Sequence, residues 1–157
     1  MKIKTLIKNF LQISPTKELD VNRIDLIRKS EVKDLRENAF LENLLCKLGL
    51  NDEELFNFPK SLYSYCGNGL HSWQYPSQFS KYLIKLSSYK ISSYLEIGAK
   101  HGGTYIVTTE YLNKFNHLKA SYAVDLFPIK GVKAYKKLNS AAQGLAMNSQ
   151  SNEFLDF

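Results

Sequence analysis

Hydrophobic residues at the start of the chain recur three and four positions apart, which is the spacing of an amphipathic helix. The pattern predicts a helix over residues 1–14, with lysines between its apolar positions, that ends before Pro15. Such a basic helix can lie on an anionic membrane, but packing of its apolar stripe on the rest of the protein is the commoner arrangement. The stripe consists of Ile3, Leu6, Ile7, Phe10 and Leu11.

Two further helices are predicted before residue 50. Asp20 is a suitable N-cap for the first of them, and Ser30 is a suitable N-cap for the second. Gly49 is a good stop for the second helix, because glycine readily takes the left-handed conformation in which many helices end. The residues expected to face inward from this helix are Val32, Leu35, Ala39, Leu41, Leu44, Leu45 and Leu48.

A loop is predicted to separate these helices from the rest of the chain. Asn51 is expected to cap a short acidic turn, and the proline and glycines beyond it predict a tyrosine-rich loop over residues 57–72. Another helix is expected to open near Pro76, since a proline in the first turn of a helix loses no hydrogen bond. Its apolar stripe consists of Phe79, Tyr82, Leu83 and Leu86.

The hydrophobic period changes after residue 90. The run SYLEIG reads as a short buried strand, GGTYIVTTEYLNKFN as a helix, and ASYAVDLF as a second strand. A strand, a crossover helix and a strand at this spacing form a βαβ unit, in which the strands are parallel and the connection is right-handed. The run GVKAYKKLN is expected to form a second, basic crossover helix, and AAQGLAMNS is expected to form a third strand.

The predicted fold class is therefore α/β. We expect an incomplete, Rossmann-like parallel sheet of three strands in residues 71–157, preceded by an amino-terminal helical region in residues 1–70. The 157 residues, 44% of them hydrophobic, suffice for one ordinary core.

Composition restricts the class of protein further. The net charge of +6 suits an anionic partner, but it equally describes a solvated, lysine-rich surface. Cys46 and Cys66 have neither metal-ligand nor disulfide-framework spacing, which favours a reducing compartment and predicts a cytoplasmic location. No apolar stretch approaches the roughly 20 residues that a membrane span requires. No metal site is expected.

A carboxylate and three glycines follow one another closely in the stretch YLEIGAKHGGT. Ligands of open parallel sheets bind beyond the carboxyl ends of the strands, where glycines let the backbone approach them. Gly98, Gly102 and Gly103 do not form the dinucleotide motif GxGxxG, because Lys100 takes the place of its middle glycine. Glu96 would repel a pyrophosphate in this turn, whereas it would attract an ammonium or sulfonium group.

Asp125 ends the second predicted strand at the same edge of the sheet. An acid in this place can bind both hydroxyls of a ribose. A cation site, a ribose site and a glycine loop together indicate S-adenosylmethionine (SAM) as the ligand. A simpler use of both acids stays open: Glu96 can cap the helix after the glycines, and Asp125 can begin a turn before Pro128.

With these motifs, residues 70–157 resemble the amino-terminal half of class I SAM-dependent methyltransferases. YLEIGAKHGGT is similar to the first motif of the family and AVDLF to the second. WQYPSQF resembles the preceding helix in a branch that includes sugar O-methyltransferases and cephalosporin-hydroxylase-like proteins. The resemblance implies that Glu96 faces the methionine amino group, that the three glycines line the methionine and ribose, and that Asp125 binds the ribose hydroxyls. It also implies that Asn148 and Ser149 lie close to the adenine.

The resemblance implies a methyltransferase that acts on a hydroxyl of a sugar or small metabolite, with no catalytic residue identified. In the family, the groups that bind acceptor or metal usually follow the fourth strand, whereas this chain ends at NEFLDF, before that strand. Three explanations stay open: a fragment of a longer enzyme, an inactive truncated product, or a complete small protein whose first helices cover the open edge. Truncation is the favoured one. A bare edge of the sheet also predicts self-association.

Further residues near the glycine loop are candidates for the site, and a second function competes with the methyltransferase. His101 lies in the glycine loop and can act as a base there, although a solvent-facing histidine is commoner. His71, Trp73 and Gln74 either form a wall over the methionine end of the cofactor or include a plain hydrophobic anchor at Trp73. The rival function is an inactive remnant or a basic module that holds RNA by charge and stacking, with nucleic acid less favoured than a small-molecule or glycan acceptor.

Overall fold

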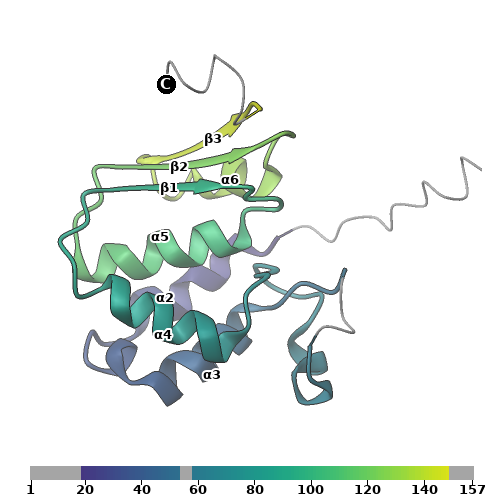
Figure 1. Cartoon of the computed structure of the whole chain (residues 1–157), viewed down its shortest axis with the longest axis vertical. Helices are drawn as coiled ribbons and strands as arrows, with labels where there is room; N and C mark the ends of the chain where they lie inside the picture. Colours follow the sequence, from purple (N-terminus) through teal and green to yellow (C-terminus); the bar gives the residue numbers. More distant parts are fainter. Residues whose placement is uncertain (1–18, 54–57, 149–157) are drawn as a thin grey trace, which may run out of the picture.

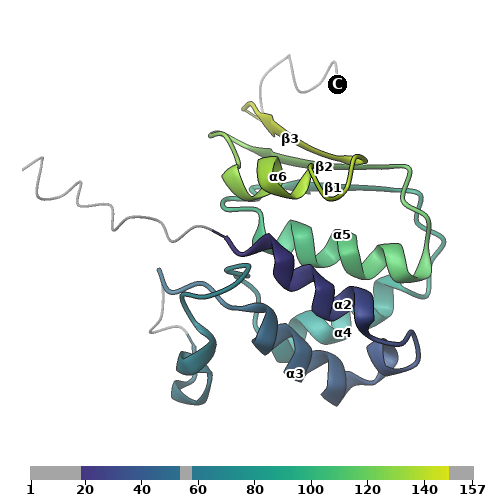
Figure 2. The same cartoon turned by 180° about the vertical axis from the view of Figure 1, so that it is seen from behind.

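The computed structural model describes residues 19–53 and 58–148. A parallel sheet forms one layer, and most of the helices lie below it in the view of Figure 1. The view from behind shows α6 in front of the strands, α5 below them, and the other helices beyond α5 (Figure 2). This is the α/β fold class predicted from the sequence. The amphipathic helix predicted for residues 1–14 lies outside the described residues.

The sheet has three strands in the order β1-β2-β3, and both pairs of neighbours are parallel. They span Ser93–Ile97, Ala120–Asp125 and Ala142–Ala146. The crossover helices α5 and α6 span Gly103–Phe115 and Lys130–Tyr135. All five elements lie where the sequence predicts them. The prediction of a buried first strand was wrong, because every residue of β1 is exposed or half-buried.

The amino-terminal helical region is built from short elements. Asp20 accepts a 3.2 Å hydrogen bond from the backbone N–H of Asn22, so the predicted N-cap is confirmed. The region continues through α4, which opens at Pro76 as predicted. Its elements are η1 (Val21–Ile24), α2 (Asp25–Lys29), η2 (Asp34–Arg36), α3 (Asn38–Leu48), η4 (Lys60–Tyr65) and α4 (Pro76–Leu86).

Ser30 does not open a helix, so that prediction was wrong. Its hydroxyl donates a 2.7 Å hydrogen bond to the carbonyl of Leu26 and thereby closes the last turn of α2. The chain then passes through η2, and α3 begins only at Asn38. Val32 and Ala39 are accordingly exposed, whereas the later apolar residues of α3 are buried as expected.

The segment after α3 is partly helical rather than an open loop. Gly49 ends α3 with φ = 104°, and a Cβ atom there would collide with the carbonyl oxygen of Asn68, so the position requires glycine. Asn51 accepts a 3.0 Å hydrogen bond from the backbone N–H of Glu53, which confirms the predicted cap. Within the predicted loop, η4 forms a helical turn.

The helical region and the sheet share one hydrophobic core. Buried residues of the first helices, such as Leu35 and Leu45, belong to the same cluster as Tyr105 of α5 and Tyr135 of α6. Tyr105 satisfies its buried hydroxyl with a 2.7 Å hydrogen bond to Ser121 of β2. This shared core holds the sheet against the helices and thereby positions the carboxyl ends of the strands.

On the sheet face opposite the helices, β1 is exposed, whereas Val124 of β2 is buried. Leu95 and Ile97 of β1 are 45% and 54% exposed there. Parallel sheets are normally covered on both faces, so this apolar face is unusual. Within residues 19–53 and 58–148, no helix has the length and apolar character needed to cross a bilayer.

Candidate ligand site

The turn between β1 and α5 is bent by three residues with left-handed backbone conformations. Gly98, Lys100 and Gly102 have φ values of 78°, 50° and 89°. Glycine adopts this region freely, but a lysine does so only when the surrounding structure holds it. The turn is therefore a fixed feature, anchored to β2 by a 2.8 Å hydrogen bond from the N–H of Gly98 to the carbonyl of Val124.

The three predicted glycines have different surroundings. Gly98 is exposed, and a Cβ atom there would have no neighbour within 4 Å, so space is open beside its backbone. A Cβ at Gly102 would lie 2.8 Å from Val132 of α6, and one at Gly103 would collide with the carbonyl of Leu70. Gly102 and Gly103 are therefore buried against protein atoms, and Gly98 is the predicted glycine that a ligand can approach.

Asp125 lies at the tip of β2 with its carboxylate turned toward this loop. One oxygen accepts a 2.7 Å hydrogen bond from the backbone N–H of Lys100, and the other accepts a 3.4 Å bond from Phe127. The second contact forms the turn that was the simpler use predicted for this acid. Asp125 is only half-buried, and a carboxylate has about four acceptor positions, so it retains capacity for a ligand.

Glu96 points to the helix-covered side of the sheet. Its carboxylate accepts a 2.7 Å hydrogen bond from the hydroxyl of Tyr94. The simpler use predicted for it, as a cap of α5, stays a prediction. Burial raises the pKa of Glu96 to about 7, although the bond from Tyr94 and the nearby backbone N–H of Tyr105 act in the opposite direction. Glu96 pairs with Ala123, so it lies two residues further from the strand ends than Asp125.

The ammonium of Lys100 lies between an aromatic ring and a carboxylate. Its Nζ is 3.4 Å from the ring centroid of Trp73 and 2.7 Å from Glu53. His101 also pairs with Glu53 through Nε2. Burial opposes ionisation of Glu53, but the bonds from Lys100 and His101 outweigh it and lower its pKa. No sequence pattern points to Glu53, because it lies 47 residues before Lys100 and belongs to no motif.

Trp73 is held over the start of α5. Its backbone N–H donates to the hydroxyl of Thr104 at 3.3 Å. Its indole Nε1 is buried and has no hydrogen-bond partner among the described residues, and its ring faces the ammonium of Lys100. Of the other two residues in the predicted wall, His71 is buried and Gln74 is exposed. The side chain of Trp73 contacts Lys100 of the glycine loop, and the backbone of His71 lies beside Gly103.

The residues predicted to lie near the adenine are only partly described. Asn148 follows β3 and is exposed at the same edge of the sheet as Asp125. Ser149 lies outside the described residues. Asp125 pairs with Ala146, so Asn148 follows two residues after the partner of Asp125. Its expected contact with the adenine of SAM stays a prediction.

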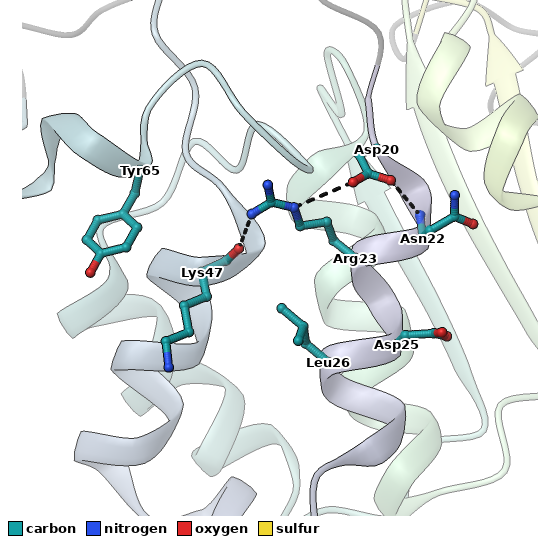
Figure 3. A pocket seen from close by; sticks show the side chains of 7 residues that line it. All are labelled: Asp20, Asn22, Arg23, Asp25, Leu26, Lys47 and Tyr65. Carbon is teal, nitrogen blue, oxygen red and sulfur yellow. Dashed lines mark hydrogen bonds and ion pairs between the residues drawn. The ribbon is translucent and has the colours of Figure 1, made fainter.

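Two shallow depressions lie away from the glycine loop. One, of about 430 Å³, is bordered by η1 and α3 (Figure 3). Arg23 crosses it and donates to the carbonyl of Lys47 at 2.6 Å while pairing with Asp20 at 3.5 Å. The other, of about 770 Å³, contains the buried Glu110, whose carboxylate accepts hydrogen bonds from two guanidinium nitrogens of Arg28, Nε and Nη2. In both depressions the strongest polar groups are already paired within the protein.

Metal-binding groups and similarity to known proteins provide no information about the function of the chain. In the part of the chain that the structure describes, no three His, Cys, Asp or Glu side chains come together as a metal-binding group. Comparisons with protein-family models, curated proteins and solved structures found no match. The assignment of a function therefore depends on the residues and geometry of the glycine loop.

Proposed function

We propose that the protein binds SAM at the carboxyl ends of β1 and β2. We further propose that it is a SAM-dependent methyltransferase, or the amino-terminal part of one, that methylates a hydroxyl of a sugar or small metabolite. The observation that carries the proposal is the half-buried carboxylate of Asp125, fixed beside the open space at Gly98. A cytoplasmic location is part of the same proposal, supported by the free thiols of Cys46 and Cys66.

The ribose is the part of SAM that this edge fits best. Ile97 pairs with Val124, so Gly98 and Asp125 are the next residues of the two neighbouring strands. The missing side chain of Gly98 leaves room for a sugar ring, and the remaining acceptor positions of Asp125 suit its two hydroxyls. The bond from Lys100 to Asp125 keeps the carboxylate in place before a ligand arrives. Such preorganisation lowers the entropic cost of binding.

The methyl transfer itself uses chemistry that belongs to SAM, whose sulfonium carries the methyl group. The chain's residues would bind the nucleoside and orient it so that an acceptor oxygen attacks in line. We assign a catalytic base to no residue. Glu96 facing the methionine amino group stays part of the proposal, since a nearby ammonium would favour the ionised form of this buried acid.

Isothermal titration calorimetry with SAM and S-adenosylhomocysteine tests the proposal. We expect micromolar binding of both to the full chain. Asp125→Ala should weaken binding about 100-fold, because two hydrogen bonds to a charged group are lost. Asp125→Asn keeps an acceptor for the N–H of Lys100 and should lose only part of the affinity.

Asp25→Ala, on the exposed side of α2, is the matched control and should bind as the original chain does. Absence of heat with both nucleosides would overturn the proposal. If RNA then bound with an affinity that falls steeply with salt, the basic-module alternative would replace it.

A further inference from the structure

Trp73 and Glu53 form a site for a positive charge, and the chain's own Lys100 fills it. The ammonium lies 3.4 Å from the centroid of the indole ring, within the roughly 6 Å over which a cation and an aromatic face attract each other. It also lies 2.7 Å from a carboxylate oxygen of Glu53. An aromatic face with an adjacent carboxylate is the combination that recognises organic cations in water.

We infer that Trp73 and Glu53 are the seat of the sulfonium group of SAM, and that the side chain of Lys100 leaves this seat when SAM binds. The inference rests on the proposed function, because it names the residues that would distinguish SAM from its neutral product. We call the pair Trp73 and Glu53 the cation seat.

The cation seat lies within reach of the ribose site. The backbone N–H of Lys100 donates to Asp125, and the ammonium at the end of the same residue rests in the cation seat. One lysine side chain therefore spans the two places. The ribose hydroxyls and the sulfur of SAM are also only a few bonds apart, so one molecule can contact Asp125 and the cation seat together.

The side chain of Lys100 is able to leave the seat. It is 43% exposed, and Glu53 is 42% exposed, so the ion pair borders solvent and contributes little to stability. A lysine ammonium is strongly hydrated in water, and it recovers that hydration when it moves outward. A sulfonium has no N–H group to hydrate, and it retains its attraction to the ring and the carboxylate.

The arrangement makes Lys100 a competitor of the ligand. A ligand that binds only when the seat is empty has an apparent affinity reduced by the fraction of molecules in which the seat is empty. Removal of the lysine ammonium should therefore strengthen binding of SAM. S-adenosylhomocysteine has a neutral sulfur, so its affinity should change much less. The ratio of the two affinities is the quantity that reports on the cation seat.

The test compares three full-length variants with the original chain. Lys100→Asn removes the ammonium while keeping a residue that tolerates positive φ. Lys90→Asn removes the same charge from an exposed loop residue and is the matched control. Glu53→Gln removes the carboxylate charge of the seat. Trp73 is the only tryptophan of the chain, so its emission reports directly on the seat during titration.

We expect Lys100→Asn to increase the preference for SAM over S-adenosylhomocysteine about tenfold, Glu53→Gln to decrease it, and Lys90→Asn to leave it unchanged. If both nucleosides bind but Lys100→Asn leaves the preference unchanged, the inference is overturned and the proposed function stands. If neither nucleoside binds any variant, the proposed function fails. Titration with trimethylsulfonium, compared with neutral dimethyl sulfide, then tests whether the cation seat binds a sulfonium. Trimethylsulfonium alone should then shift the emission of Lys100→Asn, and an unchanged emission would overturn the seat too.

Discussion

The carboxylate of Asp125 accepts a 2.7 Å hydrogen bond from the backbone N–H of Lys100 and so ties the tip of β2 to the glycine loop. Lys100 has φ = 50°, a conformation that is unfavourable for a lysine. The hydrogen bond compensates for that cost, and it fixes the carboxylate in the orientation proposed for ribose binding. One contact therefore serves both the stability of the loop and the geometry of the site.

Loss of this contact should destabilise the protein even without a ligand. Asp125→Ala should lower the free energy of unfolding by about 2 kcal/mol, because the N–H of Lys100 loses a charged acceptor. Asp125→Asn retains an acceptor oxygen and should cost less than half as much. Urea denaturation followed by circular dichroism measures both values. Equal losses in the two variants would show that the hydrogen bond does not hold the loop.

The two kinds of glycine in the loop should respond differently to alanine. Gly98→Ala places a side chain in open space, so it should cost only about 1 kcal/mol for the left-handed backbone. Gly103→Ala forces a Cβ against the carbonyl of Leu70, and the start of α5 must move. We expect a loss of about 3 kcal/mol or more in that variant.

Thermal and urea unfolding of the two alanine variants, measured side by side, give the comparison. Where both variants remain folded, the variant with the smaller loss of stability, Gly98→Ala, should show the larger loss of affinity for the nucleosides. Gly98→Ala should weaken SAM binding in spite of its small effect on stability, because its new methyl group enters the space proposed for the sugar. A stable Gly98→Ala variant with unchanged affinity would place the ribose elsewhere.

Local sequence patterns predicted most of the fold. The short apolar run in SYLEIG and the longer period that follows it predicted the positions of β1 and α5. The burial of α5 agrees with its pattern, whereas β1 is exposed or half-buried along its whole length. Ser30 misled the prediction because its hydroxyl has two local uses, and the bond back to Leu26 prevailed over a cap on the next helix. Nothing in the sequence near Ser30 distinguishes the two uses.

The candidate site was predicted less completely, for a physical reason. Asp125 and Gly98 follow from their positions at strand ends, which the βαβ pattern places together. The contact between Lys100 and Glu53 joins segments that no spacing rule connects, because tertiary packing brings them together. The bond from the hydroxyl of Tyr94 to Glu96 could likewise not be established from the position of Glu96 in the motif.

The half-buried carboxyl of Glu96 should make stability depend on pH. Its pKa of about 7 in the folded protein lies above the ordinary value of 4.5, so the folded state holds a proton that the unfolded state has lost. The free energy of unfolding should therefore fall as the pH rises from about 4.5 to 7 and level off above that range. Glu96→Gln removes the titration and should be more stable than the original chain at pH 8, by up to about 3 kcal/mol.

Urea unfolding of both proteins at a series of pH values measures the difference. It should be small near pH 4.5 and largest above pH 7. Glu31→Gln, a change of the same chemistry on an exposed side chain, controls for general effects of charge. A constant difference between Glu96→Gln and the original chain across this range would mean that Glu96 is ionised at low pH in the folded protein.

The open face of β1 should promote association between copies of the chain. Leu95 and Ile97 are exposed there, β1 is an edge strand of the described sheet, and the residues that alternate onto this face carry no charge. A second copy offers the same uncharged apolar surface, so a two-fold contact can cover both faces at once.

Sedimentation velocity over a range of concentrations should show dimers or larger species, and Leu95→Lys should shift the population toward monomer. Leu138→Lys alters a side chain of similar exposure, 42% against 45%, and should not. Equal effects of both lysines would mean that charge alone, and not this face, governs association.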